Sequence, residues 1–117
     1  MVEQEVSRGG IYLAKLNPSK DSEIGKVRPV IILNSRIILK AKPPIVFICP
    51  LSSKSHKNFT DLHVKILSRD GLDINSFALV EHCRSISVSR LNYPRISQVS
   101  DVEISTIIMR LQYLIGA

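Results

Sequence analysis

An arginine stands at the start of a strand that the sequence predicts to be buried. Arg28 precedes Pro29 and an apolar run from Val30 to Leu33. The run carries no polar alternation, so we expect the strand to be covered on both faces. The guanidinium of Arg28 would then be held at the edge of the core, where its fork of N–H donors suits a carboxylate or a phosphate.

A hydroxyl group reaches the same place if this strand pairs with the next one. The apolar run 45–51 predicts a strand of similar length, and a link of about ten residues favours antiparallel pairing over a parallel crossover. Pairing Asn34 with Ile45 places Arg28 opposite Leu51. Ser52 is then the first residue beyond the strand end, within reach of the arginine.

A polar loop enters at this end of the predicted strands and carries Glu23 between Lys20 and Lys26. A guanidinium and a hydroxyl can bind a phosphate and stabilise the charge that develops on its oxygens. A neighbouring carboxylate can accept a proton from the nucleophile. In RNA the nucleophile is the 2′-hydroxyl beside the scissile phosphate, so this route needs no metal ion, and no cysteine or histidine pair stands at metal-ligand spacing.

These residues require a small, mainly β scaffold to position them. Ser100 and Glu103 form a capping box that starts a C-terminal helix with one apolar face. We predict a single domain over residues 1–117, a small β-barrel or curled sheet with this helix packed on it. The predicted strands are Ile11–Leu16, Arg28–Asn34, Ile45–Leu51, Leu62–Leu67, Ser76–His82 and Arg84–Val88, the last two forming one or two strands.

Composition limits the partners and the compartment. A net charge of +6 favours a polyanion such as nucleic acid, an acidic protein or an anionic membrane surface. No apolar run is long enough to span a bilayer, and the acidic start differs from a secretory signal, so we expect a cytoplasmic protein. Cys49 and Cys83 lie in apolar runs, which favours buried, reduced thiols over a disulfide or a reactive thiol.

Three segments resemble the MazF/PemK (Kid-like) toxins of bacterial toxin–antitoxin pairs. They are residues 8–12 with 17–19, residues 22–32, and residues 46–53, where Pro50-Leu51-Ser52-Ser53 is similar to the family's Pro-Leu-Thr-Ser. The similarity resumes at residues 78–86 and includes the terminal helix, so it covers nearly the whole chain.

This resemblance implies an SH3-like small β-barrel of five to seven strands with a C-terminal helix, assembled as a homodimer. It implies a metal-independent endoribonuclease without a cofactor, which cuts single-stranded RNA at short sequences and leaves a 2′,3′-cyclic phosphate and a 5′-hydroxyl. A cognate acidic antitoxin would cover the RNA groove. By position, Arg28 matches the catalytic arginine, Ser52 the catalytic threonine, and Glu23 a motif glutamate linked to acid–base work.

Other residues are candidate RNA contacts, each weighed against an ordinary solvated or structural role: Lys20, Lys26, Ser53, Lys54, His56, Glu81 and His82. His63 is expected to be exposed on an alternating strand, and an ion pair of Arg28 with Glu23 or Glu81 is the structural alternative to catalysis. The segment 36–42, both apolar and basic, would either cover the barrel or contact the antitoxin. Two other functions are compatible with the resemblance: a gyrase poison on the same fold, and a non-catalytic RNA-binding barrel.

Overall fold

The protein consists mainly of β-strands with a helix at its C-terminus, as predicted. The structure is a computed structural model that describes residues 5–17, 20, 25–54 and 59–117. Its strands are β1 (Gly10–Lys15), β2 (Val27–Ile32), β3 (Ile45–Ser52), β4 (Val64–Ile66), β5 (Ser76–Ala78), β6 (Arg84–Ser87) and β7 (Leu91–Gln98). Its helices are α1 (Arg36–Lys40) and α2 (Asp101–Ile115), with short 3-10 turns η1 (Thr60–Leu62), η2 (Val80–His82) and η3 (Val88–Arg90).

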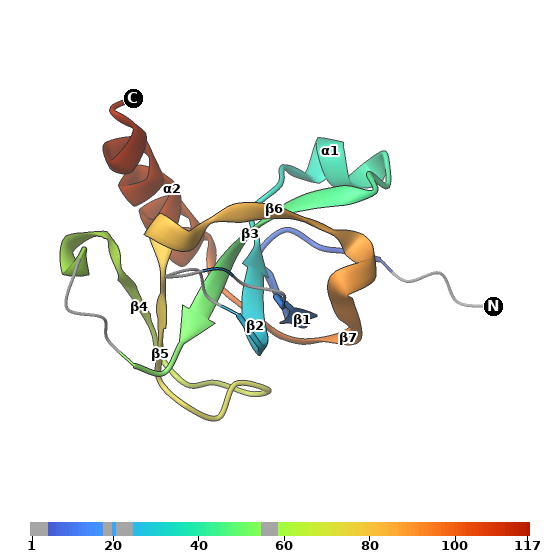
Figure 1. Cartoon of the computed structure of the whole chain (residues 1–117), viewed down its shortest axis with the longest axis horizontal. Helices are drawn as coiled ribbons and strands as arrows, with labels where there is room; N and C mark the ends of the chain where they lie inside the picture. The colour runs from blue at the N-terminus through green and yellow to red at the C-terminus, as the bar shows by residue number, and fades with distance from the viewer. Residues whose placement is uncertain (1–4, 18–19, 21–24, 55–58) are drawn as a thin grey trace.

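The described strands form one curled antiparallel sheet. Its order is β4-β5-β3-β2-β1-β7, with β6 also paired to β3 (Figure 1). The helix α2 lies against one side of this sheet, and the curl of β1, β2, β3, β6 and β7 encloses the other. Neither α1 nor α2 is long and apolar enough to cross a membrane.

The central strands bury both of their faces. Successive side chains of a strand point to opposite faces, so Ile31 joins the hydrophobic cluster under α2 while Val30 and Ile32 join the cluster inside the curl. In the same way, Cys49 and Ile48 of β3 enter different clusters. The prediction that the strand after Arg28 is covered on both faces is therefore confirmed.

The capping box at the start of α2 forms as predicted. The Ser100 Oγ accepts the N–H of Glu103 at 3.1 Å, and the Ser100 N–H donates to the Glu103 carboxylate at 2.8 Å. That carboxylate also forms a bidentate ion pair with Arg69, at 2.7 and 2.6 Å. Ile104 and Ile107 are buried under the sheet. The helix start is thus fixed both to its own backbone and to the turn before β5.

Several elements differ from the prediction. The segment 36–42 was expected as a link, but Ser35 caps it and α1 forms there, ending before Pro43 and Pro44. The strand β7 was not predicted. The predicted strand Ser76–His82 stops at Ala78 because η2 turns the chain, and Leu62–Leu67 is a strand only over β4.

The two cysteines lie close together in the core. Cys49 is fully buried and Cys83 half-buried, and both are free thiols. Burial, together with a hydrogen bond to Cys83, raises the pKa of the Cys49 thiol well above its ordinary value. Because reactivity belongs to the thiolate, the structure favours a packing role for Cys49, as the sequence suggested.

Candidate active site

The pairing of β2 with β3 brings Arg28 and Ser52 to the same level of the sheet. Val30 pairs with Pro50, Ile31 with Cys49 and Ile32 with Ile48. Two residues beyond the last of these pairs, the same register places Arg28 and Ser52 at one level, where Ser52 already pairs with Phe77 of β5.

The predicted register was wrong by one residue. It placed Arg28 opposite Leu51 and left Ser52 outside the strand, whereas Ser52 is the last residue of β3. The cause lies at the other end of the hairpin, where the Asn34 side chain accepts the N–H of Phe47 at 2.8 Å and lengthens the link that holds α1. The two residues proposed for catalysis are nevertheless brought together.

Arg28 and Ser52 line one pocket of about 600 Å³, which we call the Arg28 pocket. Lys26 and Ser53 lie in its wall, as does Asp73, a carboxylate that the sequence reading missed. The remaining wall is largely apolar and comes from β1, β2, β3, the segment 71–76 and β7. A basic fork and a hydroxyl in a partly apolar pocket can hold a phosphate away from bulk water.

The turn that closes this pocket depends on a glycine. Gly71 has a φ of +86°, and a Cβ at this position would lie 1.6 Å from the carbonyl oxygen of Ile96. The turn at Asp70-Gly71 therefore packs directly on the backbone of β7 and carries Asp73 to the pocket. The sequence indicated a turn here, but its contact with a distant strand left no local signal.

The guanidinium of Arg28 is half-buried and is oriented by its own loop. Its Nε donates to the carbonyl of Gly25 at 2.9 Å, and its two terminal nitrogens bond no other residue in the described part of the chain, so they can bind a ligand. Within the described residues it makes no ion pair. Glu81 is engaged elsewhere, and Glu23, the other predicted partner, lies outside the described residues.

The loop between β1 and β2 is fixed at its two ends. Lys26 has a positive φ of 68°, and its N–H donates to the Asn17 side chain at 2.8 Å. Its carbonyl accepts the N–H of Leu16 at 2.9 Å. Lys26 is exposed at the pocket, whereas Lys20 is exposed and does not line it.

Ser52 has a structural bond as well as a place in the pocket. Its side chain is almost fully buried, with 6% of the residue exposed, and its Oγ accepts the N–H of Lys54 at 3.2 Å. A hydroxyl that accepts one bond can still donate its proton to a ligand. Lys54 is exposed and does not line the pocket, and the predicted contact His56 lies outside the described residues.

Glu81 and His82 are not brought to the Arg28 pocket. They lie in η2, where the Glu81 carboxylate bonds the His63 Nε2 at 2.7 Å. The two side chains are only 11% and 3% exposed, so the expectation that His63 is solvent-exposed was wrong. His63 lies just before β4, and its ring is bonded to Glu81 of η2 instead of facing solvent.

Comparisons with known proteins agree with this fold. The model of a family described as PemK-like, MazF-like toxin of type II toxin–antitoxin systems matches residues 7–115. The "Endoribonuclease MazF" of Staphylococcus saprophyticus is 33% identical over 95 residues, which is 80% of this chain and 78% of that protein.

Solved structures extend the likeness to the backbone. A MazF of Deinococcus radiodurans superposes with a TM-score of 0.82 at 18% identity, covering 98% of this chain and all of that one (100%). The Mycobacterium tuberculosis toxin MazF-mt6 superposes with a TM-score of 0.73 at 18% identity, covering 92% of this chain and 96% of that one. A chain of a MazE–MazF structure from D. radiodurans superposes with a TM-score of 0.74 at 20% identity, covering 97% of this chain and 98% of that one.

Proposed function

The chain belongs to the PemK-like, MazF-like toxins of type II toxin–antitoxin systems, and we propose that it is a sequence-specific endoribonuclease of single-stranded RNA. The similar protein of S. saprophyticus carries the name of an endoribonuclease. The observation that best supports the proposal in this chain is that Arg28 and Ser52 line one pocket. Cleavage in the cytoplasm, where mRNA is translated, fits this role.

The proposed reaction uses the 2′-hydroxyl of the substrate as its nucleophile. The 2′-oxygen attacks the adjacent phosphorus while its proton passes to Glu23, and the bond from phosphorus to the 5′-oxygen breaks. Arg28 neutralises the charge on the phosphoryl oxygens and is the candidate donor of a proton to the leaving 5′-oxygen. Ser52 donates a hydrogen bond to a phosphoryl oxygen. The products are a 2′,3′-cyclic phosphate and a 5′-hydroxyl.

The remaining predicted contacts divide by position. Lys26 and Ser53 lie in the wall of the Arg28 pocket and are proposed to contact the scissile nucleotide or its neighbours. Lys20, Lys54 and His56 belong to the flanking loops and would follow the phosphate backbone. The buried bond between Glu81 and His63 favours a structural role for Glu81 over RNA contact.

The test of this function is cleavage of a long single-stranded RNA by the pure protein in EDTA, with analysis of the new termini. We expect cyclic-phosphate ends from the natural protein and none from Arg28→Ala. The melting temperature of this variant should stay close to that of the natural protein, because the Arg28 side chain makes a single hydrogen bond within the described residues, to Gly25. Lys65→Ala, which removes an exposed cation outside the pocket, is the control.

Each contrary result has a definite meaning. Equal cleavage by Arg28→Ala would exclude the proposed role of the arginine. Salt-sensitive RNA binding without cleavage by the natural protein would indicate a non-catalytic barrel, and trapped DNA breaks without RNA cleavage would indicate a gyrase poison.

Two partners follow from the proposed function. Structures of MazE with MazF exist for D. radiodurans, and a mycobacterial endoribonuclease is known in complex with its cognate antitoxin. We propose an acidic antitoxin for this basic chain as well. We also propose a homodimer, because the core-facing side of α2 continues past the sheet with Leu114 and Ile115 exposed.

A further inference from the structure

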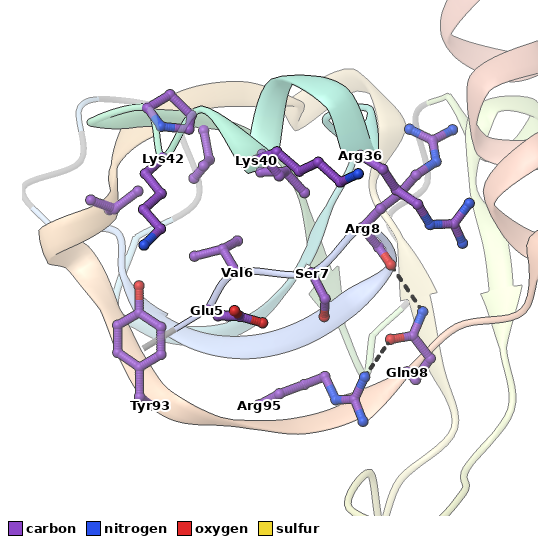
Figure 2. A pocket seen from close by; sticks show the side chains of 14 residues that line it. Glu5, Val6, Ser7, Arg8, Arg36, Lys40, Lys42, Tyr93, Arg95 and Gln98 are labelled. Carbon is purple, nitrogen blue, oxygen red and sulfur yellow. Dashed lines mark hydrogen bonds between the residues drawn. The ribbon is translucent and has the colours of Figure 1, made fainter. Parts of the chain in front are cut away.

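A second pocket opens at the other end of β3. It has a volume of about 690 Å³ and lies between α1, the segment 5–8 and β7 (Figure 2). We call it the barrel mouth, because its floor is the hydrophobic cluster inside the curl. Of the residues that the structure describes, none lines both this pocket and the Arg28 pocket. Val46 lines the barrel mouth and Ser52 the Arg28 pocket, so about 20 Å of strand separates the two at 3.3 Å per residue.

The rim of the barrel mouth is strongly basic. Among the described residues, five cationic side chains line it, against one carboxylate, that of Glu5. They come from segments far apart in the sequence: Arg8, Arg36, Lys40, Lys42 and Arg95. Cations gathered from separate segments repel one another unless an anion lies between them, so this arrangement points to an anionic ligand.

Two of these cations are held in place and two are available. Arg8 donates to the carbonyl of Leu33 at 2.6 Å. Arg95 donates to the Gln98 side chain at 2.9 Å, and that side chain donates to the carbonyl of Arg8 at 3.1 Å (Figure 2). Arg36 and Lys40, four residues apart on the exposed side of α1, make no hydrogen bond or ion pair within the described residues.

The floor of the barrel mouth is apolar and includes an aromatic ring. Leu39, Val46 and Val88 line it together with Tyr93, whose ring packs edge-on against Tyr12 at 5.8 Å between centroids. A nucleotide combines a flat apolar base with a charged phosphate, which matches an aromatic floor under a cationic rim. An acidic peptide would match the rim but would leave the ring without a stacking partner.

We propose that the barrel mouth is a second RNA-binding site, which holds a nucleotide and its phosphate away from the cleaved bond. The inference rests on the proposed function, because that function supplies single-stranded RNA as the ligand. The segment 36–42, apolar and basic at once, then has a role: Leu39 contributes to the floor, and Arg36 and Lys40 to the rim. Binding at the barrel mouth raises the affinity for long RNA and leaves the chemistry at the Arg28 pocket unchanged.

The experiment measures binding of a random-sequence 2′-O-methyl RNA of about 24 nucleotides, long enough to reach beyond one site of 4 to 16 nucleotides. The methyl group blocks 2′-hydroxyl attack, so binding is measured without cleavage. The variants are Arg36→Ala and Lys40→Ala, singly and together, with Lys65→Ala as the control. All three residues are exposed, and alanine suits the helix that holds Arg36 and Lys40, so the melting temperatures of these variants should not change. Lys65 lies in β4, and its melting curve is recorded as well.

The double variant should raise the dissociation constant roughly tenfold at low salt and lower the slope of log affinity against log salt by about 1.4, or 0.7 for each lost phosphate contact on a single strand. Lys65→Ala should change neither quantity. On a short cleavable RNA that spans only the Arg28 pocket, the KM of the double variant should equal that of the natural protein.

Three results would overturn the inference. An unchanged affinity for the long RNA would show that the rim does not bind it. An equal loss with Lys65→Ala, or an equal rise in KM on the short RNA, would show an effect of overall charge. Unchanged RNA binding with lost binding of poly-glutamate would assign the barrel mouth to acidic peptides. Failure of the proposed function is separate, since it appears as absent cleavage by the natural protein.

Discussion

The hydroxyl of Ser52 serves both the fold and the proposed chemistry. It accepts the N–H of Lys54 and lines the same pocket as Arg28. Ser52→Ala should lower the cleavage rate about 100-fold, as expected when one donor to a developing negative charge is lost. Ser52→Thr keeps the hydroxyl, and its methyl group restricts the rotamer, so this variant should cleave at least as fast as the natural protein.

Single-turnover cleavage of one RNA by both variants provides the measurement. Melting curves control for the lost bond to Lys54, which should cost about 1 kcal/mol in the alanine variant only. If Ser52→Ala cleaves as fast as the natural protein, the hydroxyl has no role in catalysis and serves only the bond to Lys54.

The buried pair of Glu81 and His63 makes a different prediction, one for stability. The two side chains bond at 2.7 Å with little exposure. Glu81→Ala should reduce the free energy of unfolding by about 3 kcal/mol, because it leaves the imidazole buried without this partner. Cleavage per folded molecule should not change, since neither residue lines the Arg28 pocket. A stable variant with impaired RNA binding would instead place Glu81 in the RNA groove.

At the scale of elements, prediction from sequence succeeded where the pattern was local. The capping box at Ser100 and the apolar runs of β2 and β3 follow from neighbouring residues. The register of β2 on β3 does not, because it depends on how α1 fills the link, and one residue of shift exchanges the faces of a strand. The strand β7 escaped prediction because Pro94 interrupts its pattern, and pairing with β1 stabilises it from the far end of the sequence.

The start of α2 should give the protein a dependence of stability on pH. The hydrogen-bonded guanidinium of Arg69 lowers the pKa of Glu103 below its usual value of 4.5. A carboxyl whose pKa is depressed by folding stabilises the protein above its unfolded pKa, and this contribution is lost as the pH falls through the folded pKa. Stability should therefore decline below about pH 4.5, where the unfolded chain binds the proton first.

Glu103→Gln should remove that part of the pH dependence and cost about 1–2 kcal/mol at pH 7, because a neutral amide keeps the cap but loses the ion pair. Urea unfolding between pH 3 and 7 measures both effects. Asp101→Asn is the matched control, since Asp101 lies in the same turn, exposed and without an ion pair in the described part of the chain. Equal pH profiles for natural protein and Glu103→Gln would contradict the prediction.

At the scale of the whole molecule, two pockets at opposite ends of β3 hold seven of the sixteen lysines and arginines. The sequence identified Arg28, Ser52 and Lys26 as neighbours because strand ends and a loop predict proximity. It could not bring Asp73 to the Arg28 pocket or gather Arg8 with Arg95, since these contacts depend on how the sheet curls. The net charge indicated that the partner is negatively charged, but it did not indicate where on the protein the partner binds.

The C-terminal half of α2 predicts how copies of the chain associate. Leu114 and Ile115 continue the face that buries Ile104 and Ile107, yet they are 41% and 69% exposed because the sheet ends before them. Exposed apolar residues in line with a core face are typical of an interface. A second copy that covers them would extend the core across the dimer.

Ile115→Asp should therefore shift the mass in light scattering from dimer toward monomer at micromolar protein. The variant should remain folded, because Ile115 contributes little to the core of one chain. Gln112→Asp places the same charge in the last turns of α2, so it controls for repulsion from the helix C-terminus. If the natural protein is monomeric, or if both variants dissociate equally, this face of α2 does not form the dimer interface.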